Sequence, residues 1–80
     1  MELAGLSPES ILDYGCGHGR VLRWFQSFWP NANLTAADVT EDQIEFCART
    51  FGANPFLIDK PFDEVELPSE YDLIWLGSIF

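Results

Sequence analysis

Three glycines at alternate positions constrain this chain most, because they directly follow a short apolar stretch that ends in an acid. The segment runs Ile11-Leu12-Asp13-Tyr14-Gly15-Cys16-Gly17-His18-Gly19-Arg20. Glycine adopts backbone angles that other residues avoid, and it lets a ligand come close to the main chain. The segment therefore predicts a strand that runs into a ligand-binding loop. Asp13, two places before the first glycine, favours a nucleoside ligand that carries an amine.

Composition places the chain among folded domains and narrows its partners. Its 80 residues are enough for one small domain, and 48% of them are hydrophobic, which argues against disorder. The 13 acidic residues outnumber the 4 lysines and arginines, giving a formal net charge of −9. Nucleic-acid phosphates need a basic surface, so this segment is not expected to bind nucleic acid. The same charge argues against binding to an anionic membrane surface.

The two cysteines and the first ten residues bear on location. Cys16 and Cys47 lack the spacing of a metal site, so no metal is expected, and Cys16 is interpreted as a small filler of the loop. Residues 1–10 show no signal-peptide pattern. No apolar run approaches the ~20 residues of a membrane span. We therefore expect a cytoplasmic protein.

The spacing of apolar residues predicts alternating strands and helices. Thr40 and Gln43 have the form of a capping box, and Gly52 is a plausible left-handed helix stop. The order strand, helix, strand, helix, strand, loop, strand predicts an α/β fold with a parallel sheet. The expected strands are 11–14, 34–37, 55–58 and 71–80, the expected helices are 20–29 and 41–51, and 59–70 is expected to be a loop.

Apolar residues of the two expected helices are assigned to their inner faces. In the first helix these residues are Trp24, Phe25 and Trp29. In the second they are Ile44, Phe46, Cys47 and Phe51.

Asp38 supplies a second candidate for ligand binding. It ends the second expected strand, 19 residues after Gly19, which suits an acid that accepts hydrogen bonds from ribose hydroxyls. The alternative is a cap for the following helix. A dinucleotide fingerprint is disfavoured, because Arg20 stands at its last glycine position and Asp13 would repel a pyrophosphate. An adenosyl cofactor with a methionine tail, S-adenosylmethionine, fits both residues better.

Three segments resemble the class I S-adenosylmethionine-dependent methyltransferases. Residues 12–22 resemble the first motif of that family, 37–40 the acidic end of its second strand, and 71–80 its fourth strand. The resemblance implies a Rossmann-like sheet with flanking helices, of which this chain supplies about four of seven strands. We therefore expect residues 1–80 to form a single partial domain, the N-terminal cofactor-binding half of a longer enzyme.

The resemblance also implies roles for individual residues. Asp13 and the backbone of Gly15 and Gly17 would hold the methionine portion, and Asp38 the ribose. Asp59 would contact the adenine amino group, with plain loop solvation as the alternative. The backbone at 76–78 would line the methionine side. The cofactor-binding positions are thus Asp13, Gly15, Gly17, Gly19, Asp38, Asp59 and Gly77.

The function implied is methyl transfer to an acceptor that these residues do not identify, with a small molecule favoured. No convincing catalytic base is found. His18 is interpreted as a loop histidine without a catalytic role, and the alternatives are an approach to the cofactor carboxylate or action as a base. The alternatives are a non-catalytic module for adenosyl-cofactor binding or interaction and, less favoured, an NAD-type dehydrogenase. The oligomeric state stays open.

Overall fold

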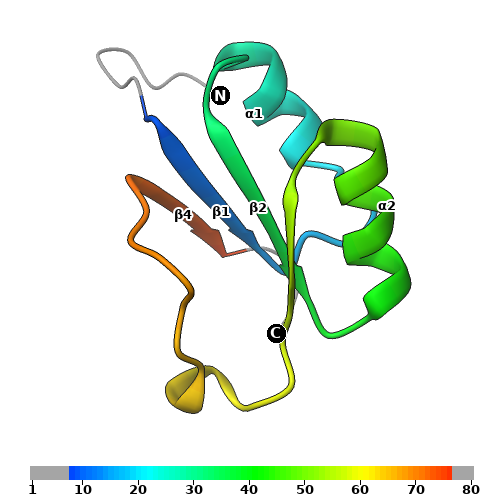
Figure 1. Ribbon diagram of the computed structural model, residues 1–80, viewed down its shortest axis with the longest axis vertical. Helices are drawn as coiled ribbons and strands as arrows, with labels where there is room; N and C mark the ends of the chain where they lie inside the picture. The colour runs from blue at the N-terminus through cyan, green and yellow to red at the C-terminus, as the bar shows by residue number, and fades with distance from the viewer. Residues whose placement is uncertain (1–7, 77–80) are drawn as a thin grey trace.

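Four parallel strands and two helices make up the computed structural model, which describes residues 8–76 (Figure 1). Gly77 and the rest of the expected fourth strand lie outside these residues. The elements in chain order are β1 (Ser10–Tyr14), α1 (Leu22–Phe28), β2 (Asn33–Asp38), α2 (Glu41–Phe51), β3 (Asn54–Leu57), the 3₁₀ turn η1 (Phe62–Glu64) and β4 (Leu73–Leu76).

The sheet has the order β3-β2-β1-β4, and every pair in it is parallel. Leu12, in the middle of β1, pairs with Thr35 of β2 on one side and with Ile74 of β4 on the other. The chain therefore moves outward in one direction through β2 and β3, then returns to the far side of β1. The parallel pairing of all strands confirms the expected α/β fold with a parallel sheet. The reversal of direction creates a crevice at the carboxyl ends of β1 and β4.

The two faces of the sheet carry separate apolar clusters. Helices α1 and α2 lie on one side of the sheet (Figure 1). Ile11 of β1 belongs to the buried cluster on that side, together with Phe25 of α1 and Cys47 of α2. The next residue, Leu12, faces the opposite side and packs near Tyr71 from the segment before β4. Alternation along a strand sends successive side chains to opposite faces. The connections from β1 to β2 and from β2 to β3 run in one direction across the sheet, and the connection from β3 to β4 runs in the opposite direction. Because such crossovers are right-handed, the connection from β3 to β4 must cross the opposite face of the sheet.

Helix α1 is shorter than expected and buries fewer of its aromatic residues. Leu22 and Phe25 are buried, three positions apart on one face. Trp24 is 52% exposed, so its assignment to the inner face was wrong. Successive helix residues point about 100° apart, so the rotation that buries Phe25 leaves Trp24 partly exposed to solvent.

Helix α2 confirms its predicted end but not its predicted cap. Gly52 has φ 67°, the left-handed conformation expected of a helix stop. Thr40 stands at the N-cap without a side-chain hydrogen bond, so the capping-box prediction was wrong. Ile44 and Cys47 form the buried face. Within residues 8–76, neither helix is long and apolar enough to cross a membrane.

Candidate functional site

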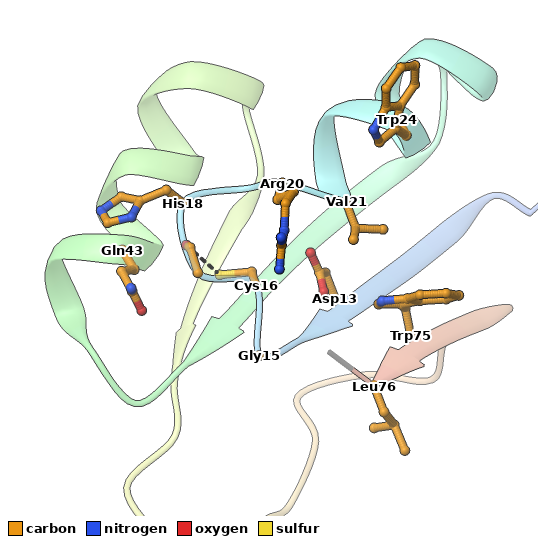
Figure 2. A pocket seen from close by; sticks show the side chains of 11 residues that line it. Asp13, Gly15, Cys16, His18, Arg20, Val21, Trp24, Gln43, Trp75 and Leu76 are labelled. Atoms are coloured by element: carbon orange, nitrogen blue, oxygen red, sulfur yellow. Dashed lines mark hydrogen bonds between the residues drawn. The ribbon is translucent and has the colours of Figure 1, made fainter. Parts of the chain in front are cut away.

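A cavity of about 610 Å³ lies at the point where the strand order reverses (Figure 2). Asp13 and Gly15 border it from the end of β1, and Trp75 and Leu76 border it from the end of β4. The glycine loop, the start of α1 and Gln43 of α2 complete the wall. Open α/β sheets bind ligands at such a position, so the cavity is the candidate site.

The loop of residues 15–19 depends on glycine at each alternate position. Gly15, Gly17 and Gly19 have φ of 89°, 55° and 80°. Side chains other than glycine rarely adopt such angles. The Gly15 and Cys16 backbone N–H groups donate to the Ala37 carbonyl, at 2.7 and 3.0 Å. These bonds bind the loop to the end of β2 and bring its backbone to the cavity.

Gly19 has a second requirement, which is space. A Cβ at this position would overlap the ring carbon Cε2 of Phe51 and lie 3.1 Å from Cζ. Gly19 does not line the cavity; it lets α1 begin close to α2. The structure therefore gives Gly19 a packing role against Phe51 of α2, and ligand contact by Gly19 stays a prediction.

Asp38 is 8% exposed and fastens the glycine loop from the β2 side. Its Oδ2 accepts a hydrogen bond from the Gly17 backbone at 2.8 Å, and its Oδ1 accepts one from the Val39 backbone at 2.7 Å. With its amide nitrogen turned inward, Gln43 also donates to Asp38, at 3.2 and 3.3 Å. Asp38 thus holds the loop, whereas Thr40 occupies the N-cap of α2.

Asp13 is the most unusual group at the site. It is 1% exposed, and among the described residues its Oδ2 has no hydrogen-bond partner. Burial, with a smaller contribution from the charge of Asp38, raises the pKa of Asp13 to about 6. A buried carboxylate without a partner is costly. A cation in the cavity beside Asp13 would remove that cost.

The two cysteines lie beneath the loop as packed thiols. Their Sγ atoms are 3.8 Å apart, and the Cys47 thiol donates to the Gly17 carbonyl at 3.5 Å. Burial raises the pKa of both thiols, so they stay protonated at neutral pH. This environment agrees with the interpretation of Cys16 as a small filler.

The remaining cofactor-binding positions expected from the sequence are Asp59 and the backbone at 76–78, and only part of this set borders the cavity. Asp59 is exposed and borders a separate hollow of about 170 Å³ beside Val65 and Glu66, so its contact with adenine stays a prediction. Gly77 lies outside the described residues, and its role also stays a prediction. Leu76, expected from the sequence to line the methionine side, does border the cavity.

Several residues that the sequence did not single out as ligand contacts also border the cavity. In the sequence, Arg20 stands out only as a departure from the dinucleotide pattern. Its position directly after the glycine loop was the signal that could have predicted its place at the cavity. Trp75 ends up there because it lies at the end of β4, and its ring packs edge-on against Phe25 with centroids 6.0 Å apart. Apart from Cys16 and His18 of the loop itself, the missed residues are Arg20, Val21, Trp24, Gln43 and Trp75.

Known proteins match this chain over nearly its whole length. A malonyl-[acyl-carrier protein] O-methyltransferase of Acetivibrio thermocellus is 32% identical over 81 residues, covering 100% of this chain and 29% of that protein. The corresponding enzyme of Anoxybacillus flavithermus is 34% identical over 74 residues, covering 91% and 29%. The chain thus spans about 29% of the length of these curated relatives.

Solved structures agree with the sequence relatives. The plantazolicin methyltransferase BpumL, in complex with a pentazolic desmethylPZN analogue and SAH, superposes with a TM-score of 0.69 at 32% identity, covering 89% of this chain and 28% of that one. An O-methyltransferase from a trans-AT PKS multienzyme of Brevibacillus brevis, in complex with S-adenosyl-L-homocysteine, gives 0.64 at 25% identity, covering 86% and 25%.

The family model described as a methyltransferase domain matches residues 11–80, which include the glycine loop, Asp38 and β4. The loop geometry, the reversal of strand order and these relatives agree, and the chain belongs to the class I S-adenosylmethionine-dependent methyltransferase family.

Proposed function

We propose that this chain provides the cofactor-binding part of an S-adenosylmethionine-dependent methyltransferase, with residues 1–80 forming one part of its domain. The observation that carries this proposal is Asp13, a buried carboxylate without a described partner on the wall of the cavity. The ammonium group of the methionine portion is the cation that it would accept. A pyrophosphate at the same place would be repelled, which disfavours a dinucleotide.

The other residues of the site fit the remaining parts of this cofactor. Gly15 and Gly17 border the cavity without side chains, so the ligand can lie against the main chain. The Asp38 carboxylate retains acceptor capacity beyond its bonds to the loop, and we assign it to the ribose hydroxyls. Asp59 is assigned to the adenine side.

The cofactor supplies an activated methyl group, and the chain's residues supply position. Holding the sulfonium group in line with an acceptor makes transfer effectively intramolecular, which is a large part of the rate increase. The relatives named above act on or bind different molecules, from malonyl-acyl carrier protein to a desmethylPZN analogue. We propose an organic small molecule as the acceptor for this chain.

Titration calorimetry of the full-length protein with S-adenosylmethionine, S-adenosylhomocysteine and NAD tests the proposal. We expect both adenosyl ligands to bind, NAD not to bind, and Asp13→Ala to weaken adenosyl binding at least tenfold. Arg49→Gln, an exposed change on α2 outside the cavity lining, is the control and should bind like wild type. Binding of NAD alone would show a dehydrogenase instead. Adenosyl binding without methyl transfer to any acceptor would favour a non-catalytic module.

A further inference from the structure

Gln43 of α2 covers the Asp38 carboxylate on the side of the cavity. With its amide nitrogen facing Asp38, Gln43 lies 3.2 and 3.3 Å from the two carboxylate oxygens. The opposite orientation would set the amide oxygen against two oxygens that only accept hydrogen bonds. Gln43 borders the cavity, across from Trp75 of β4 (Figure 2), whereas Asp38 is buried and is not among the described residues of the lining. The amide of Gln43 therefore separates the carboxylate from the cavity.

The hydrogen bonds that Asp38 already accepts leave it no free position for a ligand. A carboxylate has about four acceptor positions, two on each oxygen. The Gly17 backbone N–H takes one on Oδ2 at 2.8 Å, and the Val39 backbone N–H takes one on Oδ1 at 2.7 Å. The two N–H bonds of the Gln43 amide take one further position on each oxygen. The protein itself then occupies every position, so a ligand must displace one of these donors.

The Gln43 amide offers Asp38 the same pattern of donors as the diol of a ribose. Each group carries two donors side by side, one for each oxygen of the carboxylate. The donors of Gly17 and Val39 belong to the backbone and are fixed by the fold. The donors of Gln43 lie at the end of a flexible side chain that is only half-buried. Gln43 is therefore the donor that a ribose can replace without any change in the backbone.

We propose that Gln43 occupies the ribose position of Asp38 in the empty protein and is displaced by the cofactor, so that Gln43 sets the cofactor affinity. This inference rests on the proposed function, from which it takes the contact between Asp38 and the ribose. The hydrogen bond between Gln43 and Asp38 must break before the ribose binds, and its free energy is subtracted from that of binding. Removing the amide should therefore destabilise the empty protein and raise the cofactor affinity by the same factor.

Gln43→Met tests this inference, because methionine keeps the length of the side chain and removes both donors. Calorimetry of the full-length protein should give the variant an affinity for S-adenosylhomocysteine about threefold to tenfold higher than that of wild type. The analogue of S-adenosylhomocysteine that lacks both ribose hydroxyls should gain nothing. The ratio of the two affinities is the readout, because a contact between methionine and the base would not change it. Gln43→Ala, which leaves no side chain to contact the ligand, should raise the ratio equally.

The stability of the empty protein supplies an independent measurement. Urea denaturation without ligand should show that Gln43→Met lowers the folding equilibrium constant by the same factor by which it raises the affinity. Arg49→Gln, on the exposed side of α2, is the control and should match wild type in stability and in both affinities.

The outcomes separate this inference from the proposed function. A lower affinity of Gln43→Met for S-adenosylhomocysteine would show that Gln43 supports Asp38 instead of competing with the ribose. That result would overturn the inference while the proposed function stands. An unchanged affinity, or an equal gain for the analogue without hydroxyls, would overturn it in the same way. A wild-type protein that does not bind S-adenosylhomocysteine would overturn both proposals together.

Discussion

Replacing Asp13 by asparagine should make the protein more stable relative to wild type as pH rises from 4 to 7. Over the same range it should make cofactor binding weaker relative to wild type. The carboxyl is 1% exposed, and its pKa is raised from 3.8 to about 6, by burial first and by Asp38 second. Between these two values the folded protein keeps the proton while the unfolded chain has lost it. Raising the pH through this range therefore lowers the free energy of unfolding, by about 3 kcal/mol in all.

Asp13→Asn removes this dependence because its amide does not titrate. We expect the difference in unfolding free energy between Asp13→Asn and wild type to shift in favour of the variant as pH rises from 4 to 7. Any constant cost of the buried amide cancels in that shift. Urea denaturation followed by tryptophan fluorescence, at several pH values and without cofactor, measures it directly. Parallel pH profiles for the two proteins would refute the reasoning.

Cofactor affinity of the wild-type protein should depend on pH in the opposite sense to its stability, rising as Asp13 ionises. The ammonium of S-adenosylmethionine binds the ionised carboxylate, so its affinity should be greatest near pH 7 and should fall above about pH 8, where the α-amino group loses its proton. Below about pH 6 it should fall, approaching tenfold for each further unit. Asp13→Asn should bind weakly at every pH.

Asp38→Asn removes the neighbouring charge and should lower the pKa of Asp13, which an NMR titration of the carboxyl carbon would detect. An unchanged pKa would exclude the charge of Asp38 as a cause.

Two further predictions concern the glycine loop and the thiols beneath it. Gly19→Ala should destabilise the protein by about 2–4 kcal/mol, since it adds both overlap with Phe51 and strain at positive φ. Gly17→Ala, with φ 55° and open space around its added Cβ, should cost about 1–2 kcal/mol, and equal costs measured by urea denaturation would contradict the steric argument. Cys16 and Cys47 should react with a thiol reagent at neutral pH only as the protein unfolds, because burial raises both pKa values; fast reaction of the folded protein would show that the pair is accessible.

Local chemistry made part of the fold and site predictable. Gly15 and Gly17 adopt the positive φ angles that their spacing suggested, and Gly52 ends α2 in the left-handed conformation. Asp38 was identified as important at the end of β2, although its bond to the Gly17 backbone was not foreseen. These features are readable because each depends on a residue's own backbone preference or on its position at the end of a strand.

Helix rotation and the choice of hydrogen-bond partner were not predictable in the same way. Trp24 fits the apolar spacing of the first helix, but that spacing is broad enough to allow several rotations, and packing of Phe25 selected one that exposes Trp24. Thr40 and Gln43 have the right types for a capping box, but the carboxylate of Asp38 offers Gln43 a charged acceptor instead.

The sequence alone determined the alternation of strands and helices, the conformation of the glycine loop, and the acids next to the end of β1 and at the end of β2. These features follow from backbone preference and strand periodicity. Only the tertiary structure decided what shares the cavity. The strand order brings Trp75 beside Asp13, although the two residues are far apart in the sequence. The turn of the glycine loop brings Arg20 to the same cavity, a position that its place in the sequence did not indicate. The pKa of Asp13 belongs to the same category, since it depends on how completely neighbouring elements exclude water from one carboxylate.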